Sequence, residues 1–459
     1  MKQTYKNNYR HLKRITINCN GGFILPSVLM ISLLVTTLLL GIVSIIFFYN
    51  AYSIQLTKKK ELDLACFSAI QLFMTDNNEY LVNERFMLID SIKVKLVPKM
   101  DGLYLKVNTT AYNKFDSSSV NYYLAAKPEV PFDNAIIISK PNLRASVSGE
   151  TTIVGNILGT SDKIKRGRIS GKPTASNNYI VGNLIKKEDI TIKFFNENFV
   201  NALFENNNLF DNSNYLDSDF ELNQLTLKQL SHDKINIING DFVLSGIIEK
   251  HGSQNQISLV VMGETIIKEG TISELDLNIM CDSLTIEENV KIENIIIAVN
   301  TGIEINGNSY LKNIQLFSKK SILINNCILE YPSTIVLYSK TEEVSNLNNS
   351  IEINSSIVNG SIILVNSNVG LSNNKNIITI DNSSKIQGLI YSENNVNISG
   401  QVSGVIYTNN FWYYKEPTEY INWLVDLKIN RVKLDSTFLL PIGFEDNNRL
   451  SILNEKWIN

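Results

Sequence analysis

The chain has 459 residues, of which 44 % are apolar and 19 % are charged, and its formal net charge is −3. This length leaves room for more than one domain, and the apolar fraction is sufficient for a sizeable buried core. Because no segment dense in Lys and Arg follows the first fifteen residues, the composition argues against a nucleic-acid partner.

An apolar segment near the N-terminus is long enough to cross a membrane. No charged side chain lies between Arg14 and Lys58. Residues 23–49, about 27 in number, would span the hydrocarbon core with some tilt. The segment is too long for an ordinary signal peptide, and no small-residue cleavage site follows it. Basic residues flank it on both sides, but a long polar domain follows, so we expect a single-pass protein with its N-terminus in the cytoplasm and its bulk outside.

The residues before this segment form a recognisable pattern. A basic leader, residues 1–22, ends in two glycines and is followed by Phe23 and the apolar run. This arrangement resembles the leader of bacterial type IV prepilins. The resemblance implies insertion in the inner membrane, cleavage after Gly22 by a prepilin peptidase, and Phe23 as the mature N-terminus. It also implies other pilin-like subunits as partners.

One position departs from the family pattern. Type IV pilins carry Glu at the fifth mature position, whereas this chain has Ser27. Subunits that lack the Glu resemble minor pilins and pseudopilins of the filament tip, so Ser27 points either to a tip position or to a plain, uncut anchor. Pro26 fits a helix start, since the first four N–H groups of a helix have no internal acceptor. An uncut helix would accommodate it too, so both readings stay open.

The helix is predicted to continue past the membrane, over residues 23–80. Leu62, Cys66, Ala69 and Phe73, with Ala65 and Leu72 beside them, form one apolar stripe at helical spacing. In residues 81–130, "SIKVKLV" and "LYLKVNTTAY" alternate apolar and polar side chains, and "SVNYYLAAK" reads as a further strand. We therefore expect a small antiparallel sheet below the helix, as in pilins.

The strongest signal is a repeat in residues 233–410. The triplets "LTI" at 284, "IEI" at 303, "ILI" at 322, "IEI" at 351, "ITI" at 378 and "VNI" at 396 look equivalent, and the first two steps are 19 residues each. A second apolar triplet follows each one, at 295, 314, 335, 362, 389 and 405. A repeat of this length with two or more short strands predicts a parallel β-solenoid, in which each turn buries a row of aliphatic side chains on the turn before.

The residues that follow the first triplets are typical of turns. They are Glu287, Asn306, Asn325, Asn354, Asp381 and Ser399. Such residues tolerate left-handed conformations, and stacked asparagines would form a hydrogen-bonded ladder. The two cysteines of this region, Cys281 and Cys327, would form a disulfide only if they faced each other on neighbouring turns. The cysteine spacing otherwise argues against a disulfide framework or a metal site.

Three further segments complete the expected organisation. Residues 134–190 have the same glycine-punctuated texture and are predicted to form the opening turns of the solenoid. Residues 191–232 are predicted to be a mainly helical insertion or lateral cap. In residues 411–459, Tyr420, Trp423, Leu424 and Leu427 have helical spacing, which predicts a C-terminal capping helix that covers the last turn.

Catalytic signatures are absent from the sequence. The three histidines, His11, His232 and His251, lie outside the regular turns, and no hydrolase, phosphate-loop or Cys/His metal motif occurs. No cofactor or metal is expected, and acid pairs such as Glu287–Glu288 and Glu342–Glu343 read as solvated turns. Carboxylates brought together from different turns keep a polysaccharide-active enzyme open. The aromatics in "FWYYKEP" fit a hydrophobic cap cluster better than a sugar site.

The sequence therefore predicts a mainly β protein with a long N-terminal transmembrane helix, a small α+β pilin-like domain, and a parallel β-solenoid with a capping helix. The function that fits best is a structural or adhesive pilin-like or pseudopilin-like protein of the cell surface, whose partners are the bilayer and a surface polysaccharide or protein. The alternatives are an unprocessed, bitopic β-solenoid protein and a polysaccharide-active enzyme.

Overall fold

The computed structural model describes residues 24–75, 84–114, 116–139, 144–161, 163–169, 171–187, 195–204, 213–216, 218–249, 256–339, 349–366, 376–444 and 449–453. The fold is mainly β, with one long N-terminal helix and a large parallel sheet, as predicted. The chain divides into two compact units, and the division runs across three strands of a small sheet. The first unit contains residues 1–71, 85–96 and 109–120, and the second contains the rest.

The first unit is built on the helix α2, Ile24–Thr75. Every described side chain from Leu25 to Glu61 is exposed, and burial begins at Leu62. The predicted stripe is buried at Leu62, Ala65, Cys66, Ala69 and Phe73. The expected contribution of Leu72 is wrong, because this side chain is 51 % exposed. The helix thus changes from an apolar rod into a helix with one buried face.

Within the same unit, the buried face of α2 packs on strands of the small sheet. The Cys66 thiol lies 3.6 Å from the carbonyl oxygen of Thr109, and the Ser118 hydroxyl donates to the Asp63 carboxylate. The sheet has the strand order β1-β2-β3-β4-β35, and β1 pairs antiparallel with β2. Its strands are β1 (Arg85–Ile89), β2 (Ile92–Asp101), β3 (Tyr104–Tyr112), β4 (Ser117–Ala126) and β35 (Leu450–Ile452).

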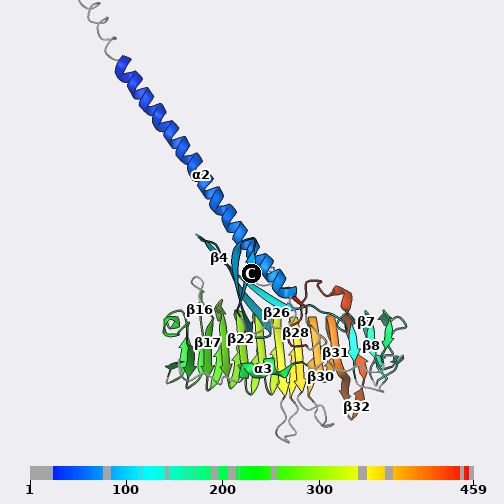
Figure 1. Cartoon of the computed structure of the whole chain (residues 1–459). Helices are drawn as coiled ribbons and strands as arrows, with labels where there is room; N and C mark the ends of the chain where they lie inside the picture. Colours follow the sequence, from blue (N-terminus) through cyan, green and yellow to red (C-terminus); the bar gives the residue numbers. More distant parts are fainter. Residues whose placement is uncertain are drawn as a thin grey trace, which may run out of the picture. The chain divides into compact units, whose positions relative to one another are not determined.

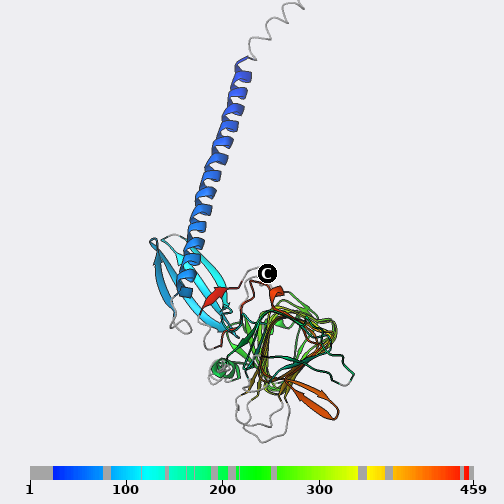
Figure 2. The ribbon, with the colours of Figure 1, turned by 90° about the vertical axis from the view of Figure 1, so that its right-hand side faces the viewer.

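The second unit is dominated by a parallel sheet that winds as a solenoid. Figure 1 shows its strands side by side, and Figure 2 looks into the closed coil. The first turns contain β12 (Ser213–Leu216), β13 (Phe220–Leu222), the 3-10 helix η1 (Leu227–Gln229), β14 (Ile235–Ile238), β15 (Phe242–Leu244), β16 (Ile247–Ile248), β17 (Ile257–Val261), β18 (Glu264–Ile267), β19 (Ile272–Ser273) and β20 (Leu277–Cys281).

The middle turns are the predicted repeats. They contain β21 (Ser283–Ile286), β22 (Lys291–Val299), β23 (Gly302–Ile305), β24 (Tyr310–Ser318), β25 (Ser321–Asn325), β26 (Ile328–Ser339), β27 (Ser350–Asn354), β28 (Ile357–Asn366), β29 (Ile377–Ile380), β30 (Lys385–Ile398) and β31 (Gln401–Lys415). The first triplets are paired in the predicted register: Leu284, Ile303, Ile322, Ile351, Ile378 and Val396 face one another from turn to turn. The proposed equivalence of these triplets is confirmed.

Two of the five expected alignments between second triplets are wrong. Ile335 pairs with Leu316 and not with Ile314. Leu389 pairs with Ser361 and not with Ile362. Register shifts between Lys312 and Gln315 cause the first offset. Because side chains alternate between faces, a slip by one residue would invert which of them enter the coil. In the actual register Ile362 and Ile390 are paired, and both enter the core.

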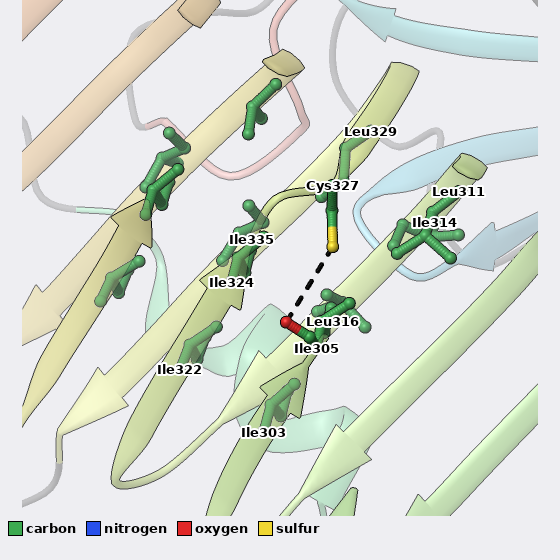
Figure 3. Packing of buried hydrophobic residues seen from close by; sticks show 14 of the residues in the cluster. Ile303, Ile305, Leu311, Ile314, Leu316, Ile322, Ile324, Cys327, Leu329 and Ile335 are labelled. Atoms are coloured by element: carbon green, nitrogen blue, oxygen red, sulfur yellow. Dashed lines mark hydrogen bonds between the residues drawn. The ribbon is translucent and has the colours of Figure 1, made fainter. Parts of the chain in front are cut away.

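Each turn of the coil has three sides, whereas the repeat analysis resolved two. The first triplets form one side and the second triplets another. Between them lies a side with a single inward residue per turn, flanked by residues that are mostly polar. This third row is Ile292, Leu311, Leu329, Val358, Ile386 and Val402, and all six belong to the core. Figure 3 shows Leu311 and Leu329 of this row beside residues of the other two. Burying one such side chain contributes roughly 1.5–3 kcal/mol.

The predicted position of the turn residues is also wrong in detail. Positive φ angles occur at Asn289, Asn308 and Asn326, one or two residues beyond the expected positions. The asparagine ladders do form. Asn326 donates to Asn308 over 2.9 Å, and Asn354 donates to Asn325 over 3.0 Å. Asn is favoured at these corners because it tolerates the left-handed conformation and its amide bonds to the next turn.

Residues 134–190 are not the opening turns of the solenoid but its last ones. Ile136 of β5 pairs parallel with Ile406 of β31, and Ile157 of β8 pairs with Ile136. Figure 1 shows β7 and β8 beyond β31. The segment adds β5 (Ile136–Ile138), β6 (Ser146–Ser148), β7 (Thr152–Val154), β8 (Ile157–Gly159), β9 (Lys165–Arg166), β10 (Ile180–Val181) and β11 (Leu184–Lys186). The chain therefore builds the far end first and returns to begin the coil at β12.

The described residues of the segment 191–232 contain less helix than predicted. The helix α3, Glu197–Phe204, lies outside the coil wall, and its Val200 is buried there. From Ser213 onward the segment forms β12, β13 and η1, which begin the coil. The predicted lateral element is thus limited to the neighbourhood of α3.

The expected capping helix at the C-terminus is wrong. Within the described residues of 411–459, the chain forms the strands β32 (Thr418–Ile421), β33 (Trp423–Val425) and β34 (Lys428–Asn430) and the 3-10 helix η2 (Arg431–Lys433). Tyr420 and Trp423 belong to strands despite their helical spacing. β34 pairs with β7, so this region joins the middle of the coil to the turns built by residues 134–190.

Candidate functional site

The long apolar helix near the N-terminus is the first candidate. α2 is the one helix of the described residues that is long and apolar enough to cross a membrane. It begins at Ile24, so Pro26 lies in its first turn, where a missing N–H costs no hydrogen bond. Ser27 lies in the same turn. Gly22 and Phe23, with the rest of the leader, lie outside the described residues.

The cysteines of the solenoid are structural. Cys281 and Cys327 are buried free thiols, so the disulfide considered from the sequence is not formed. The Cys327 sulfur lies 3.9 Å from the carbonyl oxygen of Ile305, on the preceding turn (Figure 3). Burial raises the pKa of Cys281 to about 12. Both thiols therefore behave as small core side chains, since the reactive form of cysteine is the thiolate.

A polar cleft in the second unit is the place best suited to chemistry or ligand binding. Its cavity, of about 30 Å³, lies between the inner ends of β2–β4 and the solenoid wall. The hairpin β2–β3 contributes Asp101, Tyr104 and Lys106, β4 contributes Tyr123, and the wall contributes Gln256, Asp276, Asn294, Ile296, Asn313 and Gln315. A neighbouring hollow shares Asp101, Lys106 and Gln256 and adds His232 and Lys234.

The turn of this hairpin is held by one polar side chain of the solenoid. The amide of Gln315 accepts a hydrogen bond from the Leu103 N–H over 2.7 Å and donates to the Asp101 carbonyl over 2.9 Å. Gly102 has φ +62°, and a Cβ there would lie 2.1 Å from the Gln315 oxygen. The polar residue inside the triplet "IQL" is therefore explained: it positions the hairpin that carries Asp101.

The charged groups of the cleft perturb one another. Burial raises the pKa of Asp101, and Asp276 raises it further, while Lys106 and the donation from Gln256 over 3.1 Å oppose this. Burial disfavours the charge of Lys106, but Tyr123 and Asp101 outweigh burial, so the pKa of Lys106 is raised. The Lys106 ammonium lies 5.3 Å from the centroid of the Tyr123 ring. Groups with perturbed pKa values occur at many functional sites and also in structural ion-pair networks, so the cleft is a candidate site.

The sequence analysis did not identify this cleft. Asp101 lies between the two segments "SIKVKLV" and "LYLKVNTTAY", and nothing in the linear sequence links it to Gln256 or Asp276. His232 lines the neighbouring hollow, whereas the acid pair Glu287–Glu288 lies in a turn outside it. Among the described residues, no group of three or more His, Cys, Asp or Glu side chains is arranged to hold a metal ion.

Comparison with known proteins gives no relative. No family model, no curated protein and no solved structure matches the chain.

Proposed function

We propose that the chain is a pilin-like structural or adhesive protein, inserted in the inner membrane of a bacterium and displaying its β-solenoid outside the cytoplasm. The observation that carries the proposal is the single helix α2, Ile24–Thr75, whose first half is apolar and exposed and whose second half has one buried face on a small sheet. An exposed apolar surface of this length is stable only in a bilayer or against other apolar helices.

The resemblance of the leader supports a processed form. In this proposal a prepilin peptidase cuts between Gly22 and Phe23, and the mature helix begins a few residues before Pro26. Ser27 lacks the carboxylate that would pair with a neighbouring subunit, so the protein occupies the tip of a filament. The long solenoid, rather than the membrane helix, then contacts the surroundings.

The mass of the mature N-terminus tests the proposal. We expect the chain purified from cells with a prepilin peptidase to begin at Phe23, and the chain from cells without the enzyme to keep the leader. In peptidase-positive cells Gly22→Ala should block cleavage, whereas Gly21→Ala should leave it unchanged. An intact leader in peptidase-positive cells would establish the plain bitopic anchor instead.

Orientation is tested separately. In spheroplasts from cells without the peptidase, where the leader is kept, an added protease should digest exposed parts of the region after Lys60 and should not reach the leader. Digestion of the leader alone would place the solenoid in the cytoplasm and contradict the proposed display.

A second candidate function rests on the cleft. Asp101 and Asp276 line it together, and burial raises the pKa of Asp101, which is the property required of a general acid beside a second carboxylate. In this alternative the protein hydrolyses a polysaccharide. Release of reducing ends by the wild type, lost in both Asp101→Asn and Asp276→Asn but kept in Asp282→Asn, which alters an exposed acid outside the cleft, would support it. No release from a panel of polysaccharides would exclude it for those substrates.

A further inference from the structure

A two-stranded aromatic ribbon projects from the solenoid wall. The end of β31 pairs antiparallel with β32, from Trp412 opposite Ile421 to Lys415 opposite Thr418. Figure 2 shows this hairpin extending outward from the coil. Side chains alternate along each strand, and directly opposed residues share a face. One face therefore carries Trp412, Tyr414, Glu419 and Ile421, and the other carries Tyr413, Lys415, Thr418 and Tyr420.

The second face is used by the protein itself. The Tyr420 ring meets the Trp423 ring edge-to-face, with centroids 5.6 Å apart. Trp423 in turn fills the space beside Gly167, where a Cβ would lie 2.3 Å from its ring. Close packing of this kind fixes the ribbon on the last turns of the coil, which are built by residues 134–190.

The first face, which we call the aromatic face (Trp412, Tyr414, Glu419 and Ile421), remains exposed. Tyr414 and Ile421 are each 50 % exposed, and Trp412 is half-buried. The Trp412 and Tyr414 rings are nearly parallel, with an interplanar angle of 10° and centroids 6.0 Å apart. A flat group that stacks on one ring is therefore aligned with the other.

The charges on the ribbon argue against a nucleic acid or an anionic membrane as its partner. Its tip carries Lys415 against Glu416 and Glu419. Stacked bases need a positively charged path for their phosphates, and an interfacial membrane contact needs Lys or Arg beside the apolar residues. The aromatic face carries neither, since Lys415 lies on the other face of the ribbon. What it offers is aromatic area with polar edges, since the Trp N–H and the Tyr hydroxyl seek hydrogen-bond partners.

We propose that the aromatic face binds a neutral polysaccharide. The C–H groups of a sugar ring are slightly positive and pack on the electron-rich faces of Trp412 and Tyr414. The Glu419 carboxylate and the polar ring edges accept from or donate to the hydroxyl groups at the rim. This inference specifies the ligand class of the adhesive function proposed above, and it depends on that function only in that the solenoid must be displayed outside the cell.

Affinity electrophoresis tests the inference with the full chain in detergent, in gels that contain soluble neutral glucans, mannans or galactans. Retardation by at least one polymer is expected. Trp412→Ala/Tyr414→Ala should weaken it about tenfold or more, since two stacking rings are lost. Tyr215→Ala, which removes a tyrosine that is 48 % exposed on the first turn, should bind like the wild type. Circular dichroism should be the same for all three proteins.

Two results would overturn the inference. One is that no neutral polymer retards the wild type. The other is that the double variant binds as well as the wild type. These outcomes are independent of the N-terminal mass, so cleavage and display can fail or succeed separately from sugar binding.

Discussion

Two sides of the solenoid are built from nearly the same aliphatic triplets but have different surroundings. On the side of the first triplets, the outward residues are Thr285, Glu304, Leu323, Glu352, Thr379 and Asn397, and all are at least partly exposed. On the side of the second triplets, one outward row is Ala298, Phe317, Val336, Ile363, Tyr391 and Tyr407, and all are buried. We call these sides the open flank and the covered flank.

The covering elements come from three distant parts of the chain. The C-terminal segment contributes Phe438, Leu440 and Phe444, and the Phe444 ring lies 5.0 Å from that of Tyr391. The region of α3 contributes Phe195, whose ring lies 5.1 Å from that of Phe444. The hairpin β2–β3 contributes Tyr104, whose hydroxyl is 2.9 Å from that of Thr334. The coil core is thus built from the same contacts repeated between neighbouring turns. The covered flank depends instead on single contacts with segments from distant parts of the chain.

The largest expected effect tests the corner that leads into the covered flank. Gly360, Gly388 and Gly404 are stacked there. A Cβ on Gly388 would lie 1.9 Å from the Gly360 carbonyl oxygen and 2.9 Å from the Phe438 ring. Because backbone cannot yield as a flexible side chain does, Gly388→Ala should lower the free energy of unfolding by more than about 4 kcal/mol. Chemical denaturation followed by circular dichroism measures this.

Gly270→Ala is the matched control for that experiment. Gly270 also has a positive φ, +70°, but a Cβ there meets no atom within 4 Å. Only the left-handed conformation is penalised, by about 1–2 kcal/mol. If Gly388→Ala and Gly270→Ala lowered the free energy of unfolding equally, the neighbouring strands would not approach Gly388 closely enough to exclude a Cβ.

The next effect compares the two flanks directly. Ile363 faces outward on the covered flank and is fully buried, so Ile363→Ala should cost about 2–5 kcal/mol through lost burial and a cavity. Leu323 faces outward on the open flank between Glu304 and Glu352. Leu323→Ala should cost less than about 1 kcal/mol, since this position keeps contact with water. Similar midpoints in urea would show that the flank of Ile363 is not covered in solution.

Part of this architecture was predictable from the sequence because the coil core repeats. Leu284, Ile303 and Ile322 recur every 19 residues, and each can be buried only on the previous copy. The difference between the flanks also has a sequence signal at the middle positions of the triplets. In the first triplets these positions are mostly polar, as at Thr285 and Glu304, whereas Ile296 and Ile363 in the second triplets are apolar. That contrast predicts one solvated and one covered wall, although it does not say what covers it.

The rest could not be predicted, because it depends on contacts made once. Nothing near Ile136 shows that its partner is Ile406, because glycine-rich turns look alike at either end of a coil. Tyr420 and Trp423 have helical spacing, but this part of the chain forms strands because β32 pairs with β31. The cleft joins Asp101 to residues more than 150 positions away, such as Gln256, whose amide donates to its carboxylate. A local sequence pattern cannot predict a contact between residues so far apart in the chain.

A smaller effect contrasts acids on the two flanks. Burial raises the pKa of Asp101 beside the covered flank, whereas the Glu269 N–H and the Lys268 ammonium lower the pKa of Glu287 on the open flank. The folded state thus holds the Asp101 proton more tightly than the unfolded state does. Stability contributed by this proton is present below the ordinary Asp pKa and is lost as pH rises through the raised value.

Asp101→Asn should therefore stabilise the protein at pH 7, because the neutral amide carries no charge that burial would penalise. The wild type and the variant should converge below the ordinary pKa of aspartate. Urea midpoints between pH 3 and pH 8, about the range over which carboxyl groups titrate, measure this. A variant that is less stable than the wild type at pH 7 would mean that the Asp101 carboxylate is stabilised, not desolvated, in the cleft.

The smallest effect concerns the ion pair on the open flank. The Lys268 ammonium lies 3.0 Å from the Glu287 carboxylate, and both side chains remain substantially exposed. Exposed pairs of this kind contribute about 0.2–1 kcal/mol and are screened by salt. Lys268→Ala should therefore shift the unfolding midpoint only slightly at low ionic strength and not at all at about 1 M salt, where the Debye length is near 3 Å. A large, salt-independent loss would reveal that the open flank is covered after all, by a partner or by another part of the chain, because only exclusion of water would make this pair strong.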